Sequence, residues 1–91
     1  MNQENQLQIK ASDEDLKGRY ANMMQVSHTK EEFFLDFFLT HPPVGEMLAR
    51  IITSPGHLKR IVAAIQDNLK RYEDNFGKIA AAEEPKKPIG F

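Results

Sequence analysis

The sequence predicts an α+β fold, in which an antiparallel meander of three to four β-strands is followed by one long C-terminal helix packed on one face. Residues 33–39 read Phe-Phe-Leu-Asp-Phe-Phe-Leu, which is apolar on both faces of a strand because successive strand side chains point to opposite sides. Two prolines at 42–43 cannot donate to a sheet ladder and therefore end this strand. Residues 55–76 repeat apolar side chains every three or four positions, which is the period of a helix.

The first strands precede the apolar run. Residues 7–9 alternate briefly and predict a short edge strand, whereas residues 11–18 are charged and turn-like. Residues 20–28 predict the next strand. A two-residue connection at 29–30 joins it to the strand at 32–40.

The last strand and the helix follow the two prolines. Residues 46–53 predict the strand, and Ser54-Pro55 predicts the helix start, because serine caps free amides and proline has a preset φ at the first helical position. Gly77 ends the helix. Its apolar stripe comprises Leu58, Ile61, Ile65, Leu69, Tyr72 and Phe76.

The chain is expected to form one domain, residues 7–77, between a disordered N-terminus, 1–6, and a flexible C-terminal tail, 78–91. A chain of 91 residues without cysteine has a small core and no disulfide to stabilise it. Oligomerisation is the remaining way to bury more surface.

Composition and charge narrow the location and the partners. The N-terminus lacks the basic and apolar regions of a signal peptide, and no apolar run reaches the roughly 20 residues of a membrane helix. We therefore expect a soluble, cytoplasmic protein without a membrane partner. The formal net charge of −1 gives no overall attraction to nucleic acid.

The predicted turns also predict which residues share a face. The connection at 29–30 places Val26 opposite Phe33, and a turn centred on Pro43 places Leu35 opposite Ile51. In the same register Leu39 lies opposite Met47. The resulting apolar face is the expected seat of the helix.

The opposite face is the predicted interface. Asp36 lies opposite Arg50 there, and Phe38 lies opposite Leu48. The full set is Met23, Phe34, Asp36, Phe38, Leu48, Arg50 and Ile52. Such a patch is unusual on a monomer, so we expect a homodimer or higher oligomer, although a different protein fits equally well. Alternatively, the N-terminal arm or the tail with Ile89 and Phe91 covers this face internally.

Other functions have weaker signals. A basic stripe on the helix, Lys59, Arg60, Lys70 and Arg71, predicts a nucleic-acid contact as the second candidate function. Carboxylates interleave with these cations, and the aromatic residues are committed to cores, so no base-stacking platform is evident.

An enzyme is the third candidate, and it requires a site between subunits. No nucleophile accompanies the predicted Asp36–Arg50 pair, so we assign no catalytic residue. The three histidines, His28, His41 and His57, fall at three different element ends, so we expect no metal and no cofactor. The leading prediction is a non-enzymatic, self-assembling protein-interaction module.

Spaced elements along residues 7–77 also resemble a known family. They include Gly18-Arg19-Tyr20-Ala21-Asn22, His28-Thr29, Glu32-Phe33, Leu35-Asp36-Phe37, Pro42-Pro43, Arg50-Ile51-Ile52, Ser54-Pro55, Lys59-Arg60, Tyr72-Glu73 and Phe76-Gly77. Together they are similar to the small prokaryotic family catalogued as domain of unknown function 3467. The resemblance implies a compact strand-rich domain ending in a helix, in bacteria or archaea, and implies no activity.

Overall fold

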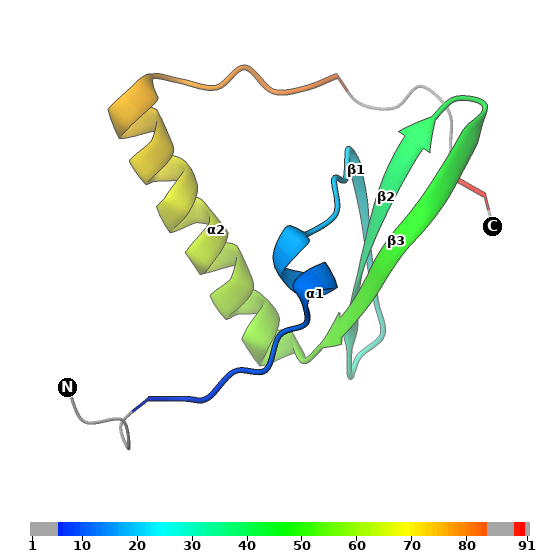
Figure 1. Ribbon diagram of the computed structural model, residues 1–91, viewed down its shortest axis with the longest axis horizontal. Helices are drawn as coiled ribbons and strands as arrows, with labels where there is room; N and C mark the ends of the chain where they lie inside the picture. Colours follow the sequence, from blue (N-terminus) through cyan, green and yellow to red (C-terminus); the bar gives the residue numbers. More distant parts are fainter. Residues whose placement is uncertain (1–5, 84–88, 91) are drawn as a thin grey trace. The chain divides into compact units, whose positions relative to one another are not determined.

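The computed structural model describes residues 6–83 and 89–90 (Figure 1). Its elements are α1 (Asp13–Lys17), β1 (Met23–His28), β2 (Phe33–His41), β3 (Val44–Thr53) and α2 (Pro55–Phe76). The chain divides into two units, one ending at Thr53 and one beginning at Ser54. A sheet followed by a C-terminal helix confirms the α+β class, whereas the packing of the helix on the sheet stays a prediction.

The sheet has three antiparallel strands in the order β1-β2-β3, so β2 has a neighbour on each side (Figure 1). Three is the lower of the two predicted strand numbers, because residues 7–9 form no strand. Strand β1 is shorter than predicted and begins at Met23, while β3 begins two residues earlier than predicted, at Val44.

The side chain of Asn22 explains where β1 begins. Its Nδ2 donates to the Thr40 carbonyl over 2.9 Å, and its Oδ1 accepts from the Thr40 N–H over 2.8 Å. The amide therefore occupies the main-chain groups of β2 that a longer β1 would pair with. A polar side chain takes the place of one step of the ladder.

The connection between β1 and β2 has four residues, 29–32, where the sequence predicted two. His28 lies opposite Phe33 and Val26 lies opposite Leu35, so the predicted pairing of Val26 with Phe33 is wrong. Thr29 sets the turn, because its Oγ1 accepts from the N–H groups of Glu31 and Glu32, both over 3.2 Å. The register moves by two residues, and the predicted faces survive because strand side chains alternate with period two.

A β-bulge divides the pairing of β2 with β3. From the bulge to the end of β3 the predicted pairs are present, with Asp36 opposite Arg50 and Leu35 opposite Ile51. Between the turn and the bulge, Phe38 lies opposite Met47 rather than Leu48, which makes Leu48 the extra residue. The predicted pair of Leu39 with Met47 is also wrong, because Glu46 takes that position. The register differs because Pro42 and Pro43 together form the hairpin loop, so the turn is centred between them and not on Pro43.

The charged segment predicted as a turn contains the short helix α1. Ser12 and Asp15 form a capping box: the Ser12 Oγ accepts from the Asp15 N–H, and the Asp15 carboxylate accepts from the Ser12 N–H, both over 3.1 Å. Gly18 ends the helix with φ 74°, a conformation that favours glycine. The sequence signal for this helix was the position of Ser12 three residues before Asp15, which is the spacing of a capping box.

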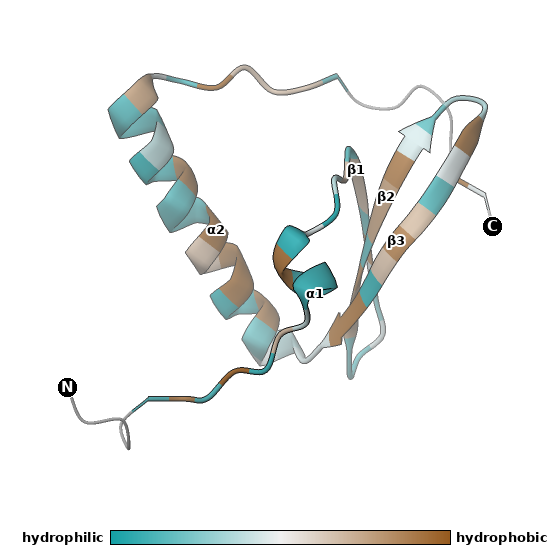
Figure 2. Cartoon of the chain, viewed as in Figure 1, coloured by the Kyte–Doolittle hydropathy of each residue, from teal (hydrophilic) through white to brown (hydrophobic). Residues whose placement is uncertain are grey.

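Helix α2 has the predicted bounds. The Ser54 Oγ accepts from the His57 N–H over 3.1 Å, Pro55 occupies the first turn, and Gly77 follows the last residue with φ 94°. Hydrophobic and hydrophilic residues alternate along the helix in Figure 2, as the period of three and four predicts. No residue of α2 is buried.

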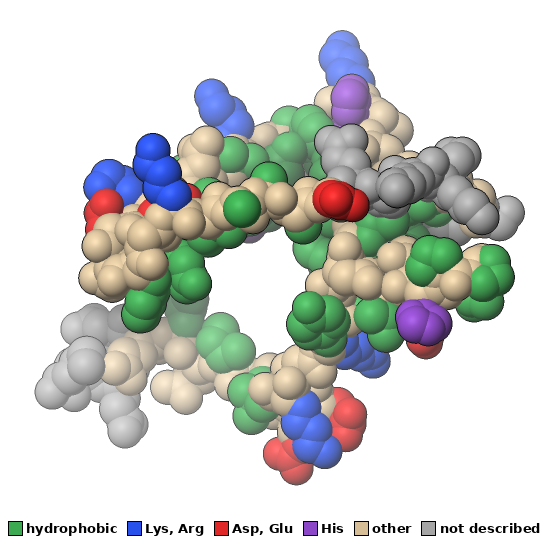
Figure 3. All heavy atoms as spheres, turned by 90° about the horizontal axis from the view of Figure 1, so that it is seen from above, with side chains coloured by type: hydrophobic (Ala, Val, Ile, Leu, Met, Phe, Trp, Pro, Cys, Tyr) green, Lys and Arg blue, Asp and Glu red, His purple; other side chains and the backbone are tan. Residues whose placement is uncertain are grey.

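Buried apolar residues are few in the described part of the chain. Leu35 and Phe38, each 5% exposed, form its hydrophobic core, and both belong to the central strand β2. Asp36 between them is 2% exposed. Many other large apolar side chains are exposed at the surface, as Figure 3 shows for one side of the molecule.

Candidate protein-interaction face

The sheet brings the seven predicted interface residues onto one side. They are Met23 of β1, Phe34, Asp36 and Phe38 of β2, and Leu48, Arg50 and Ile52 of β3. Cross-strand pairs place six of them there, because directly opposite residues of an antiparallel pair project on the same side. Leu48 has no partner across the described sheet, and it joins this side because its neighbour Ala49 faces the other one. We call this side the Asp36 face, and the opposite side the Leu35 face.

At the centre of the Asp36 face, Arg50 makes a bidentate ion pair with Asp36. The Arg50 Nε donates to Asp36 Oδ1 over 2.7 Å, and Nη2 donates to Oδ2 over 2.9 Å. The Asp36 side chain is 3% exposed, whereas the Arg50 side chain is 47% exposed. The Arg50 Cζ also lies 5.9 Å from the ring centre of Phe34, within range of a cation–π contact. The Asp36 carboxylate is therefore buried, and the partly exposed Arg50 guanidinium binds it from the solvent side.

This contact favours the charged form of both groups. Hydrogen bonds from Arg50 hold the pKa of Asp36 below its usual value, against the opposing effect of desolvation. The same bonds raise the pKa of Arg50. The pair is therefore charged on both sides and neutral in sum at physiological pH.

Exposure varies across the Asp36 face. Phe38 and Asp36 are buried, as expected if another segment of the same chain covers this part of the face. Three further residues are half-buried: Met23, Phe34 and Leu48. Ile52 and Arg50 remain exposed. The open part of this face therefore lies on β3 rather than on the Phe38 ring.

The bulge adds Met47 to the Asp36 face. Sequence reasoning placed Met47 on the Leu35 face, but its pairing with Phe38 puts it on the other side. Its side chain is exposed. The side-chain pattern does not indicate this bulge. The only available signal was the length of the Pro42–Pro43 loop, because a two-residue loop sets a register that differs by one residue from the pairing beyond the bulge.

Of the four cations predicted for nucleic acid, two are paired within α2. Lys70 donates to Asp74 over 2.8 Å, and Arg71 lies 3.0 Å from Asp67. Within residues 6–83 and 89–90, Lys59 and Arg60 have no ion pair. Half of the predicted basic stripe is thus neutralised by its own helix.

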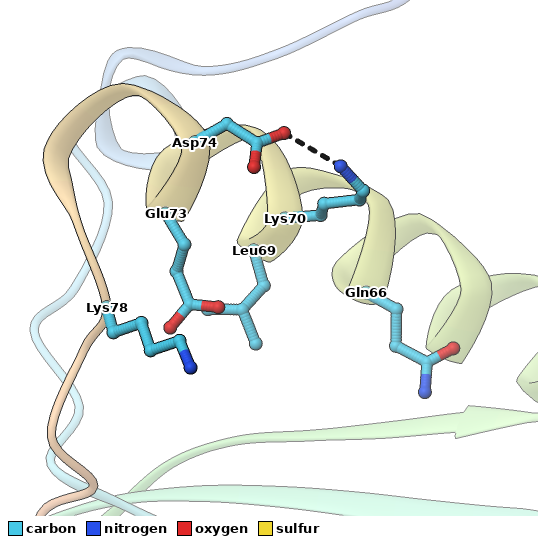
Figure 4. Close-up of a pocket in the computed structure, with 6 residues that line it drawn as sticks. All are labelled: Gln66, Leu69, Lys70, Glu73, Asp74 and Lys78. Atoms are coloured by element: carbon cyan, nitrogen blue, oxygen red, sulfur yellow. Dashed lines mark hydrogen bonds and ion pairs between the residues drawn. The ribbon is translucent and has the colours of Figure 1, made fainter.

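A shallow hollow lies beside the end of α2 (Figure 4). Its lining residues are Gln66, Leu69, Lys70, Glu73, Asp74 and Lys78. The Glu73 carboxylate accepts from the Ile79 N–H over 2.9 Å, and Asp74 is held by Lys70. Its carboxylates are thus engaged in ending the helix and in pairing along it.

The three histidines do not converge. His28 contacts the Phe33 ring at a centroid distance of 5.1 Å, and the His57 main chain joins the cap of α2. In the described ranges, no three side chains among His, Cys, Asp and Glu are grouped to hold a metal ion. Nor does any described helix have the length and hydropathy to cross a membrane.

Comparison with known proteins identifies a family. The model of the family described as "Protein of unknown function (DUF3467)" matches residues 1–81. No curated protein and no solved structure gives a match.

Proposed function

The chain belongs to the DUF3467 family of unknown function, and we propose that it is a non-enzymatic module that assembles with a second copy through its Asp36 face. One observation carries this proposal: the neighbouring residues Ile51 and Ile52 project to opposite sides of β3 and are 49% and 52% exposed. Both faces of the sheet thus present large apolar groups. A single helix has one apolar stripe and can cover one face.

The small core supports the same proposal. Only Leu35 and Phe38 form the buried apolar core of the described chain. Full burial of a large aliphatic side chain contributes about 1.5–3 kcal/mol, so covering Ile52 and its neighbours gains free energy that the separate chain lacks. Short domains commonly obtain this additional burial by oligomerisation.

The proposed absence of catalysis follows from the state of the polar groups. Asp36 is buried, and each of its two carboxylate oxygens already accepts a hydrogen bond from Arg50. The two carboxylates of the described hollow beside α2 are already engaged, Asp74 by the Lys70 ammonium and Glu73 by the Ile79 N–H. These features favour a binding role.

Sedimentation equilibrium of the full chain over micromolar concentrations tests the proposal. We expect a dimer or higher oligomer for the native chain, and dissociation when Ile52→Lys places a charge on the Asp36 face. The matched control is Ile51→Lys, which is adjacent, equally exposed and on the Leu35 face.

The control separates assembly from folding. Ile51→Lys should lower the melting temperature and retain the native mass, and Met24→Lys on β1 provides a second control on that face should the first variant unfold. A native chain that stays monomeric at high micromolar concentration contradicts the proposal. Equal dissociation by all three variants contradicts the assignment to the Asp36 face.

A further inference from the structure

One row of the Asp36 face carries polar side chains on all three strands. Gln25 of β1 lies opposite Asp36, and Asp36 lies opposite Arg50 of β3. Gln25 is exposed, and its amide makes no hydrogen bond within the described residues. Arg50 uses Nε and Nη2 for Asp36, while its Nη1 group has no partner among the same residues. The row ends in an unused acceptor on β1 and unused donors on β3.

We propose that two copies stack their Asp36 faces about a two-fold axis parallel to β2, so that each Arg50 donates to the Gln25 side-chain carbonyl of the other copy. This arrangement rests on the proposed self-assembly and specifies its geometry. Strands β1 and β3 each lie about 4.8 Å from the central strand β2, on its two sides, and so about 9.6 Å from each other. A half-turn about β2 therefore sets β1 of one copy over β3 of the other.

The alternative axis within the interface runs across the strands, and the row disfavours it. That axis sets Arg50 over Arg50 and Gln25 over Gln25, which brings like charges together and leaves the donors without acceptors. Like-charge contacts across an interface are unfavourable, whereas an amide carbonyl suits a guanidinium already neutralised by Asp36. The axis along β2 is the one that satisfies both ends of the row.

The dimensions of stacked sheets allow this contact. Packed sheets lie about 10 Å apart, a distance that an arginine and a glutamine side chain bridge together. Asp36 lies near the middle of the nine residues of β2, where the twist of the two stacked sheets displaces the facing strands least. The same axis places Met47 over Met23 in the neighbouring row, which pairs two apolar side chains.

Charge variants of Gln25 test the axis, because assembly and folding respond with opposite signs. Gln25→Glu places a carboxylate beside the Asp36 of its own chain, which disfavours the fold, but also opposite Arg50 of the second copy. Gln25→Lys favours the fold and opposes assembly. We expect Glu to tighten the dissociation constant roughly two- to fivefold and Lys to weaken it by a similar factor, at low salt. Both effects should shrink at about 0.5 M salt.

Ser27→Glu is the matched control, since Ser27 is exposed on the same strand and face but lies in the row of Ile52. It should not tighten assembly. If Gln25→Glu weakens assembly, or if neither Gln25 variant changes it, the proposed axis is wrong although self-assembly stands. If the native chain never assembles, the proposed function itself fails and the axis fails with it.

Discussion

Arg50 of β3 covers the buried carboxylate of Asp36 on the adjacent strand β2 and donates two parallel hydrogen bonds to it, of 2.7 and 2.9 Å. A carboxylate flanked in the chain by two large apolar residues is costly unless charged hydrogen-bond donors satisfy it. The pair therefore fixes the register beyond the bulge, because a slip of one residue would move Arg50 to the other face.

Removing either member of the pair should lower stability unequally. Arg50→Met leaves an unpaired buried carboxylate, whereas Asp36→Asn leaves a half-exposed guanidinium that water can solvate. We expect the melting temperature to fall by several degrees for Asp36→Asn and further for Arg50→Met. The double variant supplies the control, and a coupling near zero in this cycle would contradict a structural role for the pair.

The pair should also give stability a defined acid dependence. The pKa of Asp36 is lower in the folded chain than its usual value of 3.8, so the folded state favours the ionised form. Its contribution is complete above about pH 5 and is lost as the pH falls through 3.8 and then through the lower folded value. The melting-temperature difference between the native chain and Asp36→Asn should be constant from pH 7 to about 5 and shrink below about 4. A difference that grows on acidification would contradict this sign.

Sequence reasoning succeeded where local chemistry decides structure. Ser54, Pro55 and Gly77 specify the ends of α2 through capping and backbone preference, and the structure has the predicted bounds. The faces of β1 and β2 were also predicted, because period-two alternation survives a register shift of two residues.

Two of the errors concern features that depend on hydrogen bonds between residues far apart in the sequence. Asn22 sets the start of β1 through bonds to Thr40, eighteen positions along the chain. The bulge at Leu48 moves Met47 to the other face, and the Leu48 carbonyl accepts from the Arg19 guanidinium over 2.7 Å. Apolar patterning carries no information on such long-range contacts.

The two helix caps should differ in their effect on stability. Ser54→Ala removes the acceptor of the His57 N–H and should cost about 1 kcal/mol, because α2 has 22 residues whose formation depends on its first turn. Ser12→Ala is the matched control: it removes a similar bond from α1, which has five residues, none of them buried. Chemical denaturation should show a smaller loss for Ser12→Ala, and Ser54→Asp should restore the cap. Equal losses would mean that α1 contributes to the cooperative fold.

Deleting one residue of β3 can test the bulge directly. Without Leu48, Met47 and Ala49 become consecutive and still face Phe38 and Phe37, so the ladder becomes regular. We expect this variant to retain its strand signal by circular dichroism with a modest fall in melting temperature, since the Arg19 bond to the Leu48 carbonyl changes.

Deletion of Ile51 is the control for the Leu48 deletion, because it removes a paired residue and takes either Arg50 or Ile52 out of register with β2. It should abolish cooperative melting. If the Leu48 deletion unfolds the chain as completely as the Ile51 deletion, then the bulge is required for the fold. If it melts cooperatively, the extra residue serves mainly to place Met47 and Leu48 together on the Asp36 face, where the proposed contact with a second copy would use them.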